Sequence, residues 1–121
     1  MDLHWTDFPD APTSGAFLCA LDEIPLDGVL SKDLNGFPFL VVLVGDTPHA
    51  YVNACPHQFL PLDHRGGELL TADGVHLMCS NHSAMFRVLD GQGTSGEGVG
   101  CRLSLIPTTI IDGNICLQEL G

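Results

Sequence analysis

The chain has 121 residues, a length that accommodates one domain and not two. Hydrophobic residues make up 45% of it, so one compact core can form and wholesale disorder is not expected. Its 4 basic and 15 acidic residues give a net charge of −11. This charge excludes the basic face that a nucleic acid or an anionic membrane surface would require.

The chain carries two further signals about its location. Its acidic start lacks the pattern of a signal peptide, and its longest apolar run, Phe37–Val44, is too short to span a bilayer. Five cysteines are an odd number, which argues against a framework of disulfides. We therefore expect a cytoplasmic protein without a membrane anchor.

The first half of the chain consists of short apolar runs separated by glycine, proline and polar residues, the pattern of an all-β fold. Residues 16–21 are expected to form a first strand, and the polar stretch at residues 22–36 is expected to be a loop. Phe37–Val44 is a continuous run of β-branched and aromatic residues, which predicts a buried strand. A turn at residues 45–48 then leads into residues 49–54, the expected hairpin partner of that strand.

The second half is predicted to contain two loops rich in glycine or proline, at residues 55–67 and 90–100. The other segments are apolar and of strand length, at residues 68–71, 75–78, 84–89, 103–111 and 115–119. The last two are joined by Asp112-Gly113-Asn114, a strong hairpin turn. Many short strands joined by such turns predict a β-sandwich or a small barrel, and we expect residues 1–121 to form a single domain.

Two segments carry side chains that can bind a metal: Cys55-Pro56-His57 and Cys79-Ser80-Asn81-His82. Each follows an apolar strand at the start of a loop, and each offers one thiol and one imidazole. Together they supply two sulfur and two nitrogen ligands. In a [2Fe-2S] cluster of the Rieske arrangement, two thiolates hold one iron and two imidazoles hold the other.

A zinc site is the competing interpretation, because two cysteines and two histidines also form a common zinc ligand set. Zinc motifs, however, usually space their cysteines as one pair and their histidines as another. A mixed pair in each segment favours the two-iron cluster.

The chain resembles the Rieske ferredoxin family from about Phe39 to its C-terminus. The resemblance is carried by AYVNACPH at residues 50–57, Pro61-Leu62, CSNH at residues 79–82, Phe86 and Gly91. It implies a Rieske-type antiparallel β-sandwich with a small cluster-binding subdomain, whose loops span about residues 55–67 and 79–86. It also implies one [2Fe-2S] cluster per chain, with Cys55 and Cys79 on one iron and His57 and His82 on the other.

Some positions depart from the pattern of the family. Residues 58–78, that is 21 residues, separate His57 from Cys79, a few more than in the commonest members, and Ser83 stands where glycine is usual. High-potential members of the family join the two cluster loops by a disulfide. The matching positions here hold Leu60 and Asn81, so the resemblance implies a potential at the low end of the Rieske range.

Three functions are compatible with such a site. The first is a monomeric electron carrier, not itself an enzyme, that passes single electrons from a flavin reductase to a terminal oxygenase or similar enzyme. The second is a small Rieske subunit of a larger reductase of the nitrite-reductase type, and the third is a sensor or binding module that uses the cluster structurally. An oxygenase is not expected, because no residues remain for a second domain with an open iron site.

The other histidines and cysteines have simpler interpretations. Histidines on loops or strand faces are usually solvated, and thiols within strands behave as small hydrophobic groups. We therefore expect no ligand role for three further histidines and three further cysteines: His49, His64, His76, Cys19, Cys101 and Cys116.

Overall fold

The computed structural model describes residues 5, 11–12, 15–25, 28–44, 47–54, 70–71, 75–78, 85–95 and 102–118. These residues form strands β1 (Phe17–Ala20), β2 (Leu30–Leu34), β3 (Phe37–Val44), β4 (Thr47–Val52), β5 (His76–Met78), β6 (Met85–Arg87), β7 (Gly93–Ser95), β8 (Leu105–Ile106), β9 (Thr108–Ile111) and β10 (Asn114–Leu117). A single 3-10 turn, η2 (Leu21–Glu23), is the described helical element. The all-β class expected from the sequence is confirmed.

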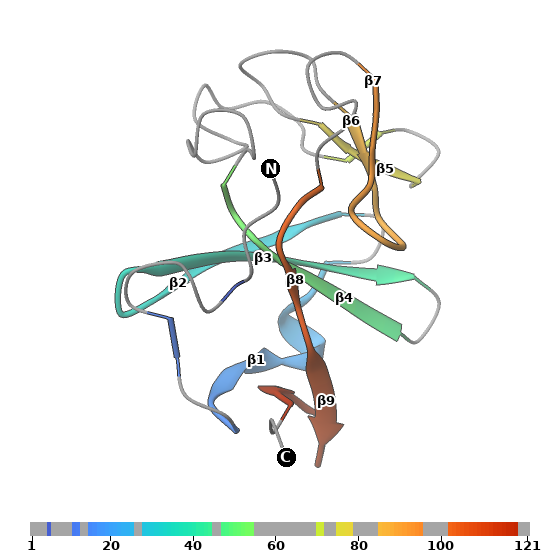
Figure 1. Ribbon diagram of the computed structural model, residues 1–121. Helices are drawn as coiled ribbons and strands as arrows, with labels where there is room; N and C mark the ends of the chain where they lie inside the picture. The colour runs from blue at the N-terminus through green and yellow to red at the C-terminus, as the bar shows by residue number, and fades with distance from the viewer. Residues whose placement is uncertain are drawn as a thin grey trace.

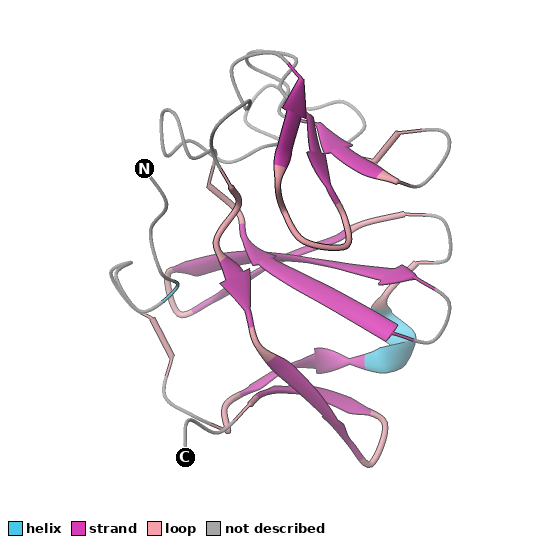
Figure 2. Cartoon of the chain, turned by 45° about the vertical axis from the view of Figure 1, so that its right-hand side comes forward, coloured by secondary structure: helices cyan, strands magenta, loops and turns pink. Residues whose placement is uncertain are grey.

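Three antiparallel sheets are stacked, with strand orders β1-β10-β9, β2-β3-β4-β8 and β5-β6-β7 (Figures 1 and 2). The four-stranded sheet lies in the middle of the molecule, as both views show. In the part of the chain that the structure describes, no helix is long and apolar enough to cross a bilayer.

Both faces of the middle sheet are buried because side chains of a strand alternate between its faces. One face contributes to a lower core, formed by Trp5, Leu18, Cys19, Ile24, Phe37, Phe39, Val41, Ala50, Val52, Ala54, Ile106, Ile115 and Leu117. The other contributes to an upper core, formed by Leu40, Val42, Tyr51, Leu77, Phe86, Val88 and Leu103. This double burial explains why β3 is apolar at nearly every position, and it confirms the buried strand predicted at Phe37–Val44.

The predicted loop at residues 22–36 is wrong over its second half, where β2 pairs with β3 along its whole length. The residues of β2 alternate between half-buried and exposed, so the strand has no continuous apolar run to reveal it. Asn35 and Gly36 have φ of 51° and 96°, the left-handed conformation of a tight hairpin turn. The Asn-Gly pair was therefore the available signal for this hairpin.

The other strand predictions need smaller corrections. The expected loop at residues 90–100 contains β7, which is short and rich in small polar residues. The expected strand at residues 103–111 is divided at Pro107 into β8, in the middle sheet, and β9, in the lower sheet. Proline lacks the N–H that a continuous ladder requires. The hairpin between β9 and β10 is confirmed, with Asp112 and Gly113 both at positive φ.

Two glycines at positive φ provide a matched test of this fold. Gly113 has φ of 79° and nothing within 4 Å of a Cβ added to it. We expect Gly113→Ala to lower the free energy of unfolding by about 1–2 kcal/mol, the cost of a left-handed backbone for an L-residue. At Gly91, with φ of 75°, an added Cβ would lie 2.9 Å from Tyr51 Cε1 and 3.2 Å from Leu103 O. Overpacking should add about 1–3 kcal/mol to the backbone cost there.

Urea unfolding of the two alanine variants measures this difference. Equal losses of stability would show that the space around Gly91 is not closed by Tyr51 and Leu103.

Candidate metal centre

The four predicted ligands, Cys55, His57, Cys79 and His82, lie outside the described residues. So do the two loops assigned to them, apart from Met85 and Phe86 at the end of the second. The structure describes the elements that lead into and out of these segments.

The segment that carries Cys79 and His82 joins the two strands of a short hairpin. Met78 and Met85 are the paired residues at the end of β5 and the start of β6. The next pair, Leu77 and Phe86, is fully buried in the upper core. The two ends of residues 79–84 are therefore anchored one pair away from a packed cross-strand contact.

The segment that carries Cys55 and His57 begins where β4 leaves the middle sheet. Beyond the end of β4, Asn53 donates its backbone N–H to Pro38 O at 3.0 Å, and Ala54 donates its own to Val52 O at 2.9 Å. Both residues are buried. The chain is thus fixed up to the residue that precedes Cys55, and this end of β4 points to the side of the middle sheet where β5, β6 and β7 lie (Figures 1 and 2).

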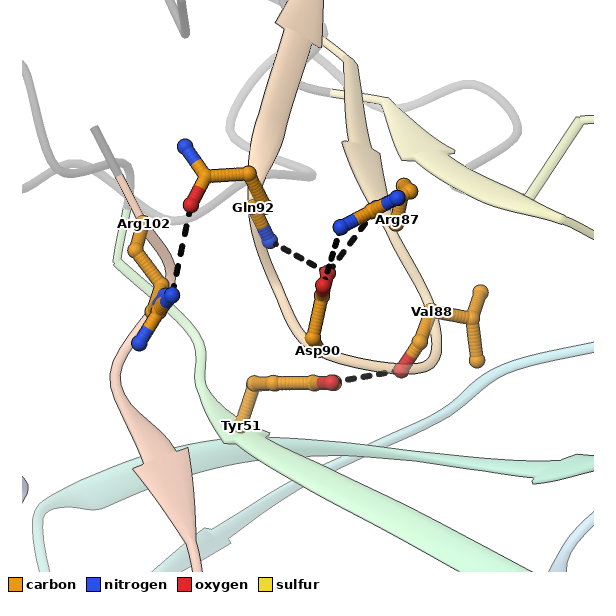
Figure 3. Close-up of polar contacts among 6 residues, drawn as sticks. All are labelled: Tyr51, Arg87, Val88, Asp90, Gln92 and Arg102. Atoms are coloured by element: carbon orange, nitrogen blue, oxygen red, sulfur yellow. Dashed lines mark hydrogen bonds and ion pairs between the residues drawn. The ribbon is translucent and has the colours of Figure 1, made fainter. Parts of the chain in front are cut away.

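Contacts between β4 and the β6–β7 turn, here called the seam, connect the strand that leads to Cys55 with the hairpin that carries Cys79 and His82. The Tyr51 hydroxyl donates a hydrogen bond to Val88 O at 2.5 Å, within the upper core (Figure 3). Leu103 donates its backbone N–H to Gly91 O at 2.9 Å, which adds a main-chain contact from the segment before β8. Strands that lead to both proposed ligand segments therefore belong to one packed unit.

Charged and polar side chains fix the shape of the β6–β7 turn (Figure 3). Asp90 accepts a hydrogen bond from the Gln92 backbone N–H at 3.0 Å and forms an ion pair with Arg87. The Gln92 bond and then the Arg87 contact lower the pKa of Asp90. Arg102 donates to Gln92 Oε1 at 3.3 Å and so joins the next strand segment to the turn.

The histidines and cysteines that the structure describes have ordinary surroundings. His49 is half-buried and pairs with Val42 inside the middle sheet, and burial lowers its pKa. His76 pairs with Arg87 at the end of the β5–β6 hairpin opposite to Met78 and Met85. Neither residue adjoins a segment that carries a predicted ligand.

Cys19 is fully buried in the lower core, and burial raises the pKa of its thiol to about 11. It therefore stays protonated at neutral pH, as expected for a thiol that acts as a small hydrophobic group. Cys116 is free and half-buried. Among the described residues, no group of three or more His, Cys, Asp or Glu side chains is placed to hold a metal ion.

The sequence did not reveal the Tyr51–Val88 contact. The two residues are 37 positions apart, and no local sequence pattern around either one predicts a contact with the other. The Asp90-Gly91 pair, in contrast, is an ordinary turn signal, and Gly91 was one of the positions that carried the family resemblance.

Comparison with known proteins gives a family match. Residues 15–108 match the model of the Rieske [2Fe-2S] domain. No curated protein matches the chain significantly.

Among solved structures, the ferredoxin of carbazole 1,9a-dioxygenase from Nocardioides aromaticivorans IC177 superposes with a TM-score of 0.72 at 22% identity, covering 88% of this chain and 99% of that one. A complex of reduced oxygenase and oxidized ferredoxin in carbazole 1,9a-dioxygenase contains a chain with a TM-score of 0.70 at 22% identity, covering 89% of this chain and 96% of that one. The terminal oxygenase from the same Nocardioides strain gives a TM-score of 0.73 at 14% identity, covering 90% of this chain but 31% of that one. These likenesses confirm the predicted fold, a Rieske-type antiparallel β-sandwich with a smaller β5–β6–β7 unit.

The single tyrosine of the chain allows a direct test of the seam. Burial, and then the negative charge of Asp90, raise the pKa of Tyr51. We expect the 13Cζ resonance of labelled tyrosine to show no deprotonation in the folded protein up to about pH 10, the ordinary value at which it should titrate in urea. The pKa of Tyr51 is higher in the folded protein than in the unfolded chain. The contribution of protonated Tyr51 to the free energy of unfolding is therefore complete below about pH 10. That contribution is lost as the pH rises toward the folded pKa.

Urea unfolding between pH 8 and pH 11 should accordingly show a smaller alkaline loss of stability for Tyr51→Phe than for the wild type. A folded protein whose tyrosine titrates with the ordinary pKa would contradict the buried seam.

Proposed function

Because the chain belongs to the Rieske [2Fe-2S] domain family, we propose that it is an electron carrier, itself without catalytic activity, that passes single electrons from a reductase to an oxygenase or a similar terminal enzyme. The family brings one [2Fe-2S] cluster per chain, which supplies one-electron redox chemistry when bound.

The observation that carries the proposal is the coverage of the structural comparisons. This chain corresponds to 99% of a ferredoxin but to 31% of a terminal oxygenase, although the two superpose about equally well. The 121 residues therefore match a whole carrier and only the Rieske part of an oxygenase. The related ferredoxin found in a complex with its oxygenase supports a terminal oxygenase as the kind of partner.

We propose Cys55, His57, Cys79 and His82 as the cluster ligands, with the two thiolates on one iron and the two imidazoles on the other. The donor set fits the group, because it has the two sulfur and two nitrogen atoms that a Rieske cluster requires. The described anchors support the assignment as well. One pair of ligands follows directly on the buried Ala54, and the other lies within the segment that joins Met78 to Met85.

The chain itself would then have two tasks in electron transfer. Its packed sheets would hold the ends of both ligand segments, and its surface would receive the partner. The net charge of −11 favours a partner with a basic docking face. No substrate pocket is required for either task.

The proposal extends to the organisation and location of the protein. We propose that residues 1–121 form one domain, because the middle sheet contributes to both cores. A cytoplasmic location is supported by the free thiols of Cys19 and Cys116 and by the odd number of cysteines.

Ligand substitutions test the site. Replacing His57 or His82 with alanine should abolish the Rieske EPR spectrum of the reduced protein, and Cys55→Ala or Cys79→Ala should reduce bound iron from two per chain to nearly none. Each change removes one of four ligands and leaves an iron site incomplete.

The described residues offer matched controls for both types of ligand. His49→Ala, His76→Ala and Cys19→Ala should each retain two irons and two sulfides per chain together with the wild-type spectrum. A colourless wild-type protein with stoichiometric zinc after anaerobic purification would refute the iron assignment.

The reduction potential should lie near −150 mV, at the low end of the Rieske range, rather than near its upper limit of about +300 mV. Leu60 and Asn81 exclude the disulfide of the high-potential members. The one tyrosine hydroxyl of the chain donates to Val88 O, so it does not serve as a donor to cluster sulfur. The acidic protein also disfavours an added electron. Protein-film voltammetry at neutral pH measures this potential, and a midpoint above about +100 mV would contradict a carrier supplied by a flavin reductase.

A further inference from the structure

The Tyr51 hydroxyl joins two segments that lead to different halves of the proposed site. Tyr51 lies on β4, four residues before Cys55, and is fully buried. Val88 directly follows β6, accepts the hydroxyl at 2.5 Å through its carbonyl and donates its N–H to Val75 O at 2.8 Å. Val75 in turn directly precedes β5. One residue, Val88, is thereby held both to its own hairpin and to the middle sheet.

The position of the tyrosine ring is as closely defined as that of its hydroxyl. Gly91 packs so near the ring that an added Cβ would lie 2.9 Å from Tyr51 Cε1. Leu103 closes the same space, with its carbonyl oxygen 3.2 Å and its Cβ 3.3 Å from that added atom. The ring has no room to swing toward Gly91, so the hydroxyl is directed at Val88.

The turn that presents Val88 O is shaped independently of Tyr51. Asp90 accepts from Gln92 N at 3.0 Å and from Arg87 Nε at 3.1 Å (Figure 3). Gly91 donates its N–H to Arg87 O at 2.7 Å. These contacts lie within the turn itself. The Tyr51 hydroxyl connects this turn to β4 through its hydrogen bond to Val88 O.

From this arrangement we propose that Tyr51 is a positioning residue, which holds the β5–β6–β7 unit at a fixed orientation on the middle sheet and so sets the two ligand segments relative to one another. The inference rests on the proposed function, because that function assigns two cluster ligands to each of the two segments to which the connected strands lead. A rigid seam keeps the four ligand atoms in one arrangement. A loosened seam lets the hairpin that carries Cys79 and His82 tilt against the end of β4.

Tyr51→Phe tests the role, because it retains the buried ring and removes the hydroxyl. The matched control is Ile115→Val, a change of one methyl group in the lower core, which lowers stability without touching the seam. Both holoproteins are compared with the wild type by iron analysis, by EPR of the reduced state and by hydrogen–deuterium exchange of peptides covering residues 85–95, 102–106 and 108–118.

We expect Tyr51→Phe to keep two irons per chain while its EPR features broaden or shift. Exchange should become about tenfold faster in residues 85–95 and 102–106, which corresponds to about 1.4 kcal/mol, and should be unchanged in residues 108–118. Ile115→Val should show the wild-type spectrum and no selective change at residues 85–95.

The outcomes that overturn the inference are distinct from those that overturn the function. A Tyr51→Phe spectrum that superposes on the wild-type spectrum would refute the positioning role, even with faster exchange at the seam. Exchange that accelerates equally in all three peptides would show a general loss of stability and would refute it as well. Wild-type protein without iron would refute the proposed function, and this inference with it.

If Tyr51→Phe does not fold, Asp90→Ala provides the same test. The Asp90 side chain is 42% exposed, and replacing it with alanine removes the Arg87 and Gln92 contacts that shape the turn presenting Val88 O. The spectrum and the exchange at residues 85–95 should change in the same direction as for a loosened seam. An unchanged spectrum in this variant would refute the proposal.

Discussion

The burial of both faces of the middle sheet is the constraint on which the rest of the structure depends. Along β3, alternate residues such as Phe39 and Leu40 enter different cores, so each face of the sheet needs its own cover. The β1–β10–β9 sheet covers one face, and the β5–β6–β7 unit covers the other (Figure 1). Burying a side chain such as Phe39 or Leu40 contributes about 1.5–3 kcal/mol, so neither cover is dispensable. The small upper unit is thus a structural part of the core as well as the carrier of half of the proposed site.

The geometry of the proposed metal site would be set by the stacking of these sheets. Metal-ligating segments are irregular, and their geometry must come from the rigid elements at their ends. Here those ends are the buried Ala54 after β4 and the Met78–Met85 pair of the β5–β6 hairpin. The two ends belong to different sheets, so the contact between the sheets decides how they face one another. Apolar packing in the upper core resists separation of the sheets but is weakly directional, whereas the Tyr51–Val88 hydrogen bond has a preferred angle and distance. That difference is the physical basis for assigning an orienting role to a single hydroxyl.

The sequence predicted the elements whose signals are local and failed where the decisive contacts are distant. The apolar run of β3 and the Asp112-Gly113 turn could be recognised from adjacent residues, and both are confirmed. β2 was missed because a half-exposed strand at the edge of a sheet resembles a polar loop, and β7 because its three residues are small. The ligand motifs are local patterns too, so the four ligands were predicted from spacing. The Tyr51 seam, 37 positions in span, left no such pattern.

The placement of the basic side chains determines which charges a partner protein meets first. The chain has four basic side chains, and the three described ones each lie against a neighbour on the same chain: Lys32 beside Glu23, Arg87 beside Asp90 and Arg102 beside Gln92. The two exposed ion pairs contribute little to stability, but Glu23 and Asp90 do reduce the positive potential that Lys32 and Arg87 present to a partner. The remaining acidic side chains therefore dominate the field outside the protein. At physiological ionic strength that field decays over about 8 Å, so it accelerates encounter with a basic surface rather than tightening the final complex. A carrier must leave its partner after each electron, and a short-range attraction of this kind permits fast arrival without slow release.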